Sequence, residues 1–306
     1  MKTAVVTGAT GMLGLALIRK LTKENYDIYA VIRPSSNRKK CIPKQDNVQI
    51  IECDLKDIKE LKNKITKKCD IFFHFGWDGT YGDARNNMNI QTQNIQSAIE
   101  AAETAKLLGC EVFLGAGSQA EYGRTEEKIS PKLCEKPENG YGMAKLCAGQ
   151  MTRVMCKRMG IKHIWCRILS TYGPYDGMQT MVMSGIRQML AGEKPSYTKG
   201  EQLWDYLYCD DAANAFYLAA VEGKDGSVYC VGSGKTRSLK EYIFAIRDAV
   251  NPNQEVGIGE IPYFENQVMY LCADITALTE DTGFIPQYSF EQGIKETVEW
   301  YKQNYQ

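Results

Sequence analysis

The chain has 306 residues, of which 44% are hydrophobic, so it is long enough to bury a large core and is not expected to be disordered. Its 37 basic and 37 acidic side chains cancel, which argues against nucleic acid or an anionic membrane as a partner. The first residues lack the apolar run of a signal peptide, and no later run approaches the roughly 20 residues that span a bilayer, so we expect a cytoplasmic protein.

Short β-branched runs alternate with longer segments of helical period through the first half of the chain. Strands are expected at residues 3–7, 28–32, 48–52, 71–75, 112–115 and 164–169, and helices at 12–23, 89–108 and 141–159. This alternation predicts an α/β fold, a doubly wound parallel sheet of Rossmann type with helices on both faces.

After Gly173 and Pro174 the pattern becomes less regular. We expect loops that hold Tyr175, Tyr197 and Trp204, then a strand at 204–209, helices at 211–221 and 239–250, and a last amphipathic helix ending near Tyr301. We infer that residues 1–166, with about 203–231, form the dinucleotide-binding domain. A smaller α/β substrate domain is then built from about 167–202 and 232–306.

The eleven cysteines include no C-x-x-C pair, and only two histidines accompany them. This pattern supports neither a disulfide framework nor a metal site, so we expect reduced structural thiols and no bound metal.

A glycine-rich loop follows the first expected strand. Gly8, Gly11 and Gly14 stand directly between that strand and a helix, where glycines permit a tight turn and let backbone amides approach a pyrophosphate. The G-x-x-G-x-x-G spacing is less common than G-x-G-x-x-G, but its place in the strand–helix alternation favours dinucleotide binding over a simple turn.

The end of the second strand indicates which dinucleotide is bound. An NAD site usually has a carboxylate there, whereas this chain has Arg33, Ser35 and Arg38. A guanidinium and nearby hydroxyls suit a 2′-phosphate, so NADP is preferred and NAD is the alternative. Asp54 and Leu55, after the third strand, are expected near the adenine, although Asp54 also suits a turn.

Three residues form a candidate redox triad. Tyr141 and Lys145 are four residues apart on an expected helix, so both lie on one helix face. A nearby ammonium lowers the pKa of a phenol and favours proton exchange near neutral pH. Ser118 follows an apolar strand and either holds a substrate carbonyl or caps the next turn. In combination the three predict carbonyl/alcohol redox chemistry.

Further motifs occur in a fixed order along the chain: Thr7-Gly8-Ala-Thr-Gly11-Met-Leu-Gly14, Asp54-Leu55, His74-Phe75-Gly76-Trp77, Asn94, Ser118-Gln-Ala-Glu-Tyr122-Gly123, Tyr141-x-x-x-Lys145, Tyr172-Gly173-Pro174 and Asp205-Tyr206 to Asp211. Together they resemble the extended short-chain dehydrogenases/reductases, in the epimerase, dehydratase and reductase branch that acts on nucleotide sugars. The resemblance covers almost the whole chain.

The resemblance implies a Rossmann domain with a C-terminal substrate domain, and a homodimer formed by helices 89–108 and 141–159. The cofactor residues given so far are the three glycines, Arg33, Ser35, Arg38, Asp54, Leu55, Tyr141 and Lys145. The resemblance adds Thr10, Met12, Leu13, Phe75, Gly76, Trp77 and Asn94. The substrate residues that we expect are Gln119, Glu121, Tyr122, Ser170, Tyr175, Arg187 and Trp204. His74 is expected to be a structural histidine.

The residues after Ser118 indicate which reaction is carried out. Dehydratases of this family carry an Asp-Glu pair there, and reductases that also epimerise commonly carry a cysteine, whereas this chain has Gln119 and Ala120. Two reactions remain open. The first is reduction of a keto-sugar by exchangeable NADPH, and the second is hydroxyl epimerisation on retained NAD. Arg33 and the segment 200–211, which resembles that of CDP-abequose synthase type 4-reductases, favour the reductase.

Some positions depart from the family pattern. Arginines that ordinarily grip the diphosphate are missing at Trp204 and in residues 263–267, and Ser170 stands where asparagine is common. Arg187, Lys199 and Arg237 are candidate substitutes, although each also suits a solvated surface. Tyr122, Tyr175 and Trp204 suit either stacking on a ligand or packing between domains. A protein that senses NADP without turnover is a further alternative, which Tyr141 disfavours.

Overall fold

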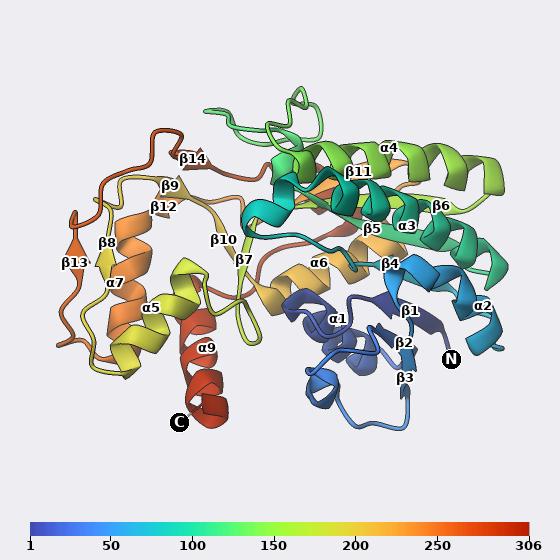
Figure 1. Cartoon of the computed structure of the whole chain (residues 1–306), viewed down its shortest axis with the longest axis horizontal. Coiled ribbons are helices and arrows are strands. Elements are labelled where there is room, and N and C mark those ends of the chain that lie inside the picture. Colours follow the sequence, from blue (N-terminus) through green and yellow to red (C-terminus); the bar gives the residue numbers. More distant parts are fainter. Residues whose placement is uncertain (306) are drawn as a thin grey trace.

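The computed structural model describes residues 1–305, and its centre is a seven-stranded sheet (Figure 1). All neighbouring strands are parallel, in the order β11-β6-β5-β4-β1-β2-β3. The strands are β1 (Thr3–Thr7), β2 (Asp27–Ile32), β3 (Val48–Glu52), β4 (Ile71–His74), β5 (Val112–Ser118), β6 (Lys162–Ile168) and β11 (Ser227–Val231). The predicted Rossmann-type fold is confirmed.

Helices cover both faces of this sheet because its strands are apolar on both sides. On β1, Ala4 and Val6 belong to a core shared with α1 (Met12–Lys23) and α6 (Cys209–Glu222). Val5, between them, belongs to a second core with α3 (Met88–Leu107) and α4 (Gly140–Met159). Successive side chains of a strand point to opposite faces, so each strand contributes to both cores.

Most of the remaining elements gather beside the sheet, at the left and centre of Figure 1. Two short strands, β7 (Ser170–Tyr172) and β10 (Tyr206–Tyr208), pair in parallel. Small sheets are formed by β9 (Leu203–Trp204), β12 (Arg237–Ser238) and β14 (Tyr270–Leu271), and by β8 (Ser196–Tyr197) and β13 (Gly257–Ile258). The helices are α5 (Met181–Leu190), α7 (Leu239–Val250) and α9 (Phe290–Tyr305), while α8 (Thr276–Thr282) packs on α6 and α2 (Leu61–Lys64) follows β3.

Helix α5 corrects the expectation of loops after Pro174. It begins after Thr180, whose hydroxyl accepts a hydrogen bond from the amide of Met183, and it buries Val182 and Ile186. Its apolar positions recur with helical spacing, but the segment is only ten residues long and carries Gly185 in its interior. A short helix of this kind gives a weak periodic signal.

Strand β5 continues to Ser118, three residues beyond its expected end. Gly115 and Gly117 make this possible because the ring of Trp165 on β6 occupies the space that a Cβ at either position would need. The extension carries Ser118 to the carboxyl edge of the sheet, where ligand sites of parallel sheets lie.

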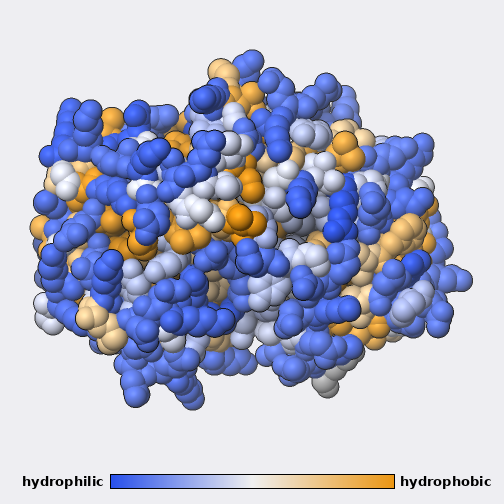
Figure 2. All heavy atoms as spheres, turned by 180° about the vertical axis from the view of Figure 1, so that it is seen from behind, coloured by the Kyte–Doolittle hydropathy of each residue, from blue (hydrophilic) through white to orange (hydrophobic). Residues whose placement is uncertain are grey.

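Two further features of the fold concern the cysteines and the molecular surface. Within residues 1–305 all eleven cysteines are free, and Cys134 and Cys147 are the exposed ones. No helix of the described part is long and apolar enough to cross a membrane. The rear face is mostly hydrophilic, with apolar side chains scattered across its middle (Figure 2).

Asp205 ties the segments around the small sheets together. Its carboxylate is fully buried and accepts hydrogen bonds from the amides of Ser233, Gly234 and Ala273 and from the Ser233 hydroxyl, at 2.6–3.0 Å. Two distant segments of backbone, at residues 233–234 and at Ala273, are therefore bonded to one side chain.

We predict that Asp205→Ala destabilises the protein by about 3 kcal/mol or more, because three amides, that of Ala273 fully buried, lose their acceptor. Urea denaturation measures the change. Asp248→Ala, which removes an exposed carboxylate that pairs only with the neighbouring Arg247, is the matched control and should change stability by less than about 1 kcal/mol. Equal effects of the two substitutions would contradict this role of Asp205.

Candidate functional site

A cavity of about 810 Å³ opens at the carboxyl edge of the sheet. Its walls come from the loop after β1, the ends of β2 and β5, the loop after β4, helix α4 and the residues after β6. Of the predicted site residues, those that line it are Gly8, Thr10, Gly11, Met12, Leu13, Gly14, Arg33, Ser35, Arg38, Leu55, Phe75, Gly76, Trp77, Ser118, Gln119, Tyr141, Lys145, Ser170 and Tyr175.

The glycine loop forms the floor of this cavity. Gly8 has a φ of +66°, and a Cβ there would meet the backbone of Phe75 and Gly76. Gly14 lies against the carbonyl of Gly8, so α1 begins close to the strand. No side chain caps the first turn of α1 in the described chain, and the residues of that turn line the cavity. This cradle fits the pyrophosphate of a dinucleotide.

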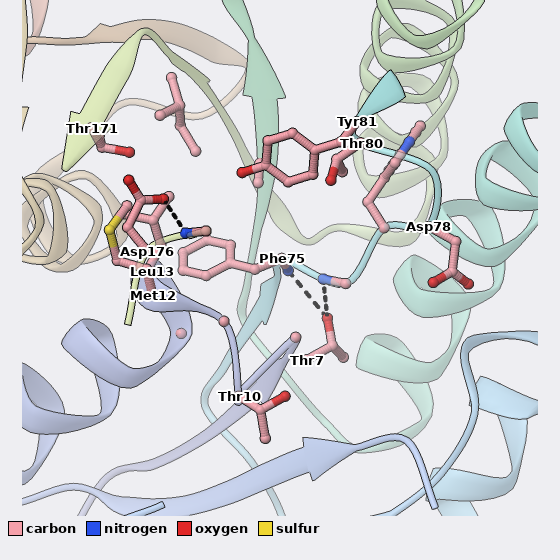
Figure 3. Close-up of a pocket in the computed structure, with 18 of the residues that line it drawn as sticks. Thr7, Thr10, Met12, Leu13, Phe75, Asp78, Thr80, Tyr81, Thr171 and Asp176 are labelled. Atoms are coloured by element: carbon pink, nitrogen blue, oxygen red, sulfur yellow. Dashed lines mark hydrogen bonds between the residues drawn. The ribbon is translucent and has the colours of Figure 1, made fainter. Parts of the chain in front are cut away.

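The loop after β4 is fixed over the cavity by Thr7. The Thr7 hydroxyl accepts hydrogen bonds from the amides of Phe75 and Gly76, both at 3.1 Å (Figure 3). Its own proton is therefore donated to Nδ1 of His74, 3.0 Å away. Burial and the nearby Lys145 lower the pKa of His74 to about 3, which makes His74 a neutral structural residue.

The end of β2 presents two arginines to the cavity. Arg33 forms an ion pair with Asp78 at 3.1 Å, and Arg38 donates to the carbonyl oxygen of Tyr175 at 2.9 Å. Ser36 and Asn37, which were not predicted, line the same wall as Ser35. The wall thus combines cationic and hydroxyl groups, but one of its cations is already paired.

Two predicted cofactor residues lie outside the cavity wall. The Asp54 carboxylate accepts a hydrogen bond from the amide of Lys56 and caps the turn Leu55–Glu60. Asn94 is buried on α3, where it accepts from the amide of Asp78 and donates to its carbonyl oxygen. In this structure, Asn94 holds the loop that carries Trp77 and Asp78.

The three triad residues meet on one side of the cavity. Lys145 is buried, donates to the carbonyl oxygen of Ala116 at 2.7 Å, and has its Nζ 3.7 Å from the centroid of the Trp77 ring. The same Nζ lies 5.8 Å from the centroid of the Tyr141 ring. Ser118 donates to the side-chain oxygen of Gln119 and accepts from the amide of Ala120.

Burial and neighbouring charges act on both titratable members of the triad. Burial raises the pKa of Tyr141, while the hydrogen bond with Ser118 and the charge of Arg85 act to lower it. Burial lowers the pKa of Lys145 to about 7, and the carboxylate of Glu121 opposes that change. A proton donor and a group that titrates near neutrality therefore share one wall of the cavity.

Glu121 and Tyr122, expected to contact substrate, lie behind the cavity wall. The Glu121 carboxylate accepts from the Ser118 amide at 2.8 Å, from Nε1 of Trp165 at 3.0 Å and from Nε of Arg167 at 2.6 Å. Arg167 also donates to the hydroxyl of Tyr122 at 2.6 Å. This buried network supports the strand end that carries Ser118, and it leaves Glu121 and Tyr122 no surface on the cavity.

A second cavity, of about 640 Å³, adjoins the first and shares Arg85 and Gln119 with it. Trp204 lines this second cavity, and its indole N–H donates to the hydroxyl of Ser170 at 2.7 Å. Arg187, on α5, lines neither cavity. The structure thus divides the expected substrate residues between the two cavities, and it places Glu121, Tyr122 and Arg187 in neither.

Several lining residues were not predicted: Asp78, Thr80, Tyr81, Arg85, Thr171, Asp176, Thr180 and Tyr206. Figure 3 shows Tyr81 and Asp176 on different walls of the cavity. Burial raises the pKa of Asp176 to about 6, against the hydrogen bonds from Gly177 and Thr180. The only sequence signal was position: Asp78, Thr80, Tyr81 and Arg85 follow the end of β4. The others lie on or after the short strands β7 and β10.

The chain matches the NAD dependent epimerase/dehydratase family over residues 4–232. It belongs to this family. Similar proteins include dTDP-glucose 4,6-dehydratase of Escherichia coli, 29% identical over 175 residues, which are 55% of this chain and 48% of that protein. A trifunctional UDP-glucose 4,6-dehydratase/epimerase/reductase of Arabidopsis thaliana is 25% identical over 99% of this chain and 47% of its own. The chain spans about half the length of these curated relatives.

Solved structures share the fold. UDP-glucose 4-epimerase of Thermotoga maritima superposes with a TM-score of 0.88 at 23% identity, covering 99% of this chain and all of that one (100%). dTDP-glucose 4,6-dehydratase of Bacillus anthracis, in complex with NAD, superposes with a TM-score of 0.85 at 19% identity, covering 99% and 97% of the two chains.

We predict that Glu121→Ala destabilises the protein by about 3 kcal/mol or more, because the Ser118 amide and the Trp165 indole lose their acceptor. The buried Arg167 then keeps only the partly exposed Glu135 as an acidic partner. Chemical denaturation gives the value. Glu138→Ala removes an exposed partner of Arg124 and should cost less than about 1 kcal/mol. A small effect at Glu121 would show that the buried pair is not what holds this strand end.

We predict a pH-dependent stability effect of Lys145. Its pKa of about 7 lies below the ordinary 10.5, so the unfolded chain binds more protons between these values and stability rises with pH across that window. Lys145→Met removes this dependence, and the stability of the wild type relative to the variant should increase from about pH 7 to about pH 10. Urea denaturation at several pH values tests this, with the exposed Lys157→Met as control. A flat difference would contradict the prediction.

Proposed function

We propose that the protein reduces a keto group, at C4, of a nucleotide-activated deoxy sugar, with NADPH as the reductant. The observation that carries this proposal is that Ser118, Tyr141 and Lys145 share one cavity with the glycine loop. The relatives named above act on nucleotide sugars according to their names, which supports this class of substrate.

The chain's own residues would perform the proton chemistry. A bound nicotinamide supplies a hydride to the carbonyl carbon. Tyr141 donates its phenolic proton to the alkoxide that forms at the carbonyl oxygen, and the Ser118 hydroxyl stabilises that oxygen by a hydrogen bond. Lys145 lies beside Tyr141 and favours the phenolate that remains.

Elimination of water is disfavoured by the residues next to Ser118. Gln119 and Ala120 carry no acid or base, and Glu121 is fully buried and bonded to Arg167. A dehydratase needs an acid and a base beside the site of hydride transfer. These positions therefore support reduction or epimerisation over the dehydratase activity for which several relatives are named.

The wall at the end of β2 supports NADP. Arg33, Ser35 and Arg38 line the cavity, and residues 33–38, which follow β2, include no carboxylate. A 2′-phosphate placed there would receive charge-assisted hydrogen bonds. One observation favours the alternative, a 4-epimerase on retained NAD: Arg33 already pairs with Asp78, so a 2′-phosphate would have to compete for it.

We also propose how the protein assembles, how its chain divides into domains and where it is located. We propose a homodimer through α3 and α4, because Met143, Met151 and Val154 lie exposed along α4 and Leu107 lies exposed on α3. Residues 1–166 with about 203–231 would bind the dinucleotide, and the rest would bind substrate. The free thiols support a reducing, cytoplasmic location.

The first test identifies the dinucleotide. The purified protein is denatured and any released dinucleotide is identified, while native protein is titrated with NADPH and with NADH by fluorescence. Empty protein that binds NADPH more tightly, and then oxidises it in the presence of a 4-keto nucleotide sugar, supports the reductase. Stoichiometric, tightly held NAD would overturn it in favour of the 4-epimerase.

We predict that Arg33→Gln weakens NADPH binding about tenfold or more and leaves NADH binding unchanged, because one charge-assisted hydrogen bond to the 2′-phosphate is lost. Fluorescence titration measures both dissociation constants. Arg247→Gln, a partly exposed arginine on α7 outside both cavities, controls for the loss of one positive charge. Equal weakening of both cofactors would exclude a 2′-phosphate contact.

A further inference from the structure

Arg85 stands where the two cavities meet. It lies in the short turn Gly82–Asn86 and lines both spaces. Its guanidinium carbon is 4.5 Å from the centroid of the Tyr141 ring, and one of its nitrogens donates to the carbonyl oxygen of Thr80 at 3.3 Å. The guanidinium therefore lies over the ring of the residue that we expect to exchange the proton.

The turn that carries Arg85 is fastened to the helix that carries Tyr141. The side-chain oxygen of Asn86 accepts a hydrogen bond from the amide of Gly140, at the start of α4, at 3.0 Å. A Cβ at Gly140 would come within 3.0 Å of the Arg85 carbonyl oxygen, so the glycine permits this close approach. The segments that carry Arg85 and Tyr141 are thus joined by the Asn86 side chain as well as by the contact between the two residues themselves.

The charge of Arg85 is not neutralised within residues 1–305. Two other arginines on the cavities have acidic partners, since Arg33 pairs with Asp78 and Arg124 pairs with Glu138. Arg38 is bonded to the carbonyl oxygen of Tyr175 instead. In the same described part no carboxylate oxygen lies within 4.0 Å of the Arg85 guanidinium nitrogens. Its full charge therefore acts on its surroundings, and Tyr141 is the nearest titratable ring that it covers.

Other groups also face Tyr141. Lys145 is farther from the ring, at 5.8 Å, and Trp77 meets the ring edge-on. Glu121, behind Ser118, and Tyr81, from the loop after β4, act against the phenolate, while the hydrogen bond with Ser118 favours it. Lys145 loses its proton near neutral pH because burial lowers its pKa to about 7, whereas a guanidinium stays charged.

We propose that Arg85 is a positioning residue that keeps a permanent positive charge over the face of Tyr141 and stabilises the phenolate of that residue. The meaning of this for catalysis rests on the proposed function. When Tyr141 gives its proton to the alkoxide oxygen, the O–H bond electron pair stays on the phenolic oxygen, and the adjacent guanidinium stabilises that charge. Arg85 would thus provide a positive charge beside Tyr141 at neutral and alkaline pH, where Lys145 is partly deprotonated.

The test measures the ionisation of residue 141 directly and needs neither substrate nor cofactor. 3,5-Difluorotyrosine, which ionises near neutral pH, is incorporated at position 141 of the full chain, and its single ¹⁹F signal is followed by NMR as pH is raised. The same titration is made with Arg85→Gln, Arg85→Lys and Arg158→Gln, the last removing an exposed charge from the far end of the same helix. Circular dichroism confirms that each protein is folded.

We expect Arg85→Gln to move the titration midpoint upward by about one pH unit, because loss of an opposite charge within 4–6 Å disfavours the ionised form. Arg85→Lys should recover at least part of the shift, and Arg158→Gln should produce none. If Arg85→Gln does not fold, Arg85→Met, which keeps the apolar stem, replaces it. An unchanged midpoint, or an equal shift in Arg158→Gln, would overturn the proposal.

The titration also separates this proposal from the proposed function. If the protein proves to hold NAD and to epimerise, the midpoint still reports whether Arg85 acts on Tyr141. If the midpoint does not move while NADPH-dependent reduction is observed, the role of Arg85 is wrong and the reductase stands. In an active enzyme, the same variants should shift the pH profile of kcat/KM in the same direction as the NMR midpoint.

Discussion

The buried carboxylate of Glu121 connects the parts of the structure that the site depends on. It joins the amide of Ser118 at the end of β5 to the side chains of Trp165 and Arg167 on β6. A buried charge is tolerated only when it is paired and fully hydrogen-bonded, and here each oxygen of Glu121 has such a partner. The position of Ser118 at the cavity is therefore set from behind, by a network that no ligand touches.

The cavity is organised by charge. Cationic groups line it at the end of β2 and next to Tyr141, while the acidic residues on its wall, Asp78 and Asp176, are paired with Arg33 or buried. Phe75 and Trp77 add uncharged surface to the same cavity. Such an arrangement suits a dinucleotide whose phosphates and nicotinamide occupy different parts of one space.

The parts of the site that could be predicted are those encoded locally. The glycine loop, the ends of β4 and β5, and the four-residue spacing of Tyr141 and Lys145 each depend on a short stretch of sequence, and the structure brings nearly all of these residues to the cavity. Glu121 and Tyr122 lie in the turn directly after Ser118, yet both are bonded to Arg167, which is 46 residues beyond Glu121. No local pattern distinguishes a side chain that faces a cavity from its neighbour that faces the interior.

By itself, the sequence determined the parallel α/β fold and the family, because strand and helix periodicity and the glycine loop follow from neighbours in the chain. Only the tertiary structure decided which charges act on Tyr141. Arg85 lies in a short turn without periodicity, and it reaches Tyr141 only because Asn86 is bonded to the start of α4. Electrostatic effects depend on distance and burial in space, and these arise only when segments far apart in the sequence have packed together.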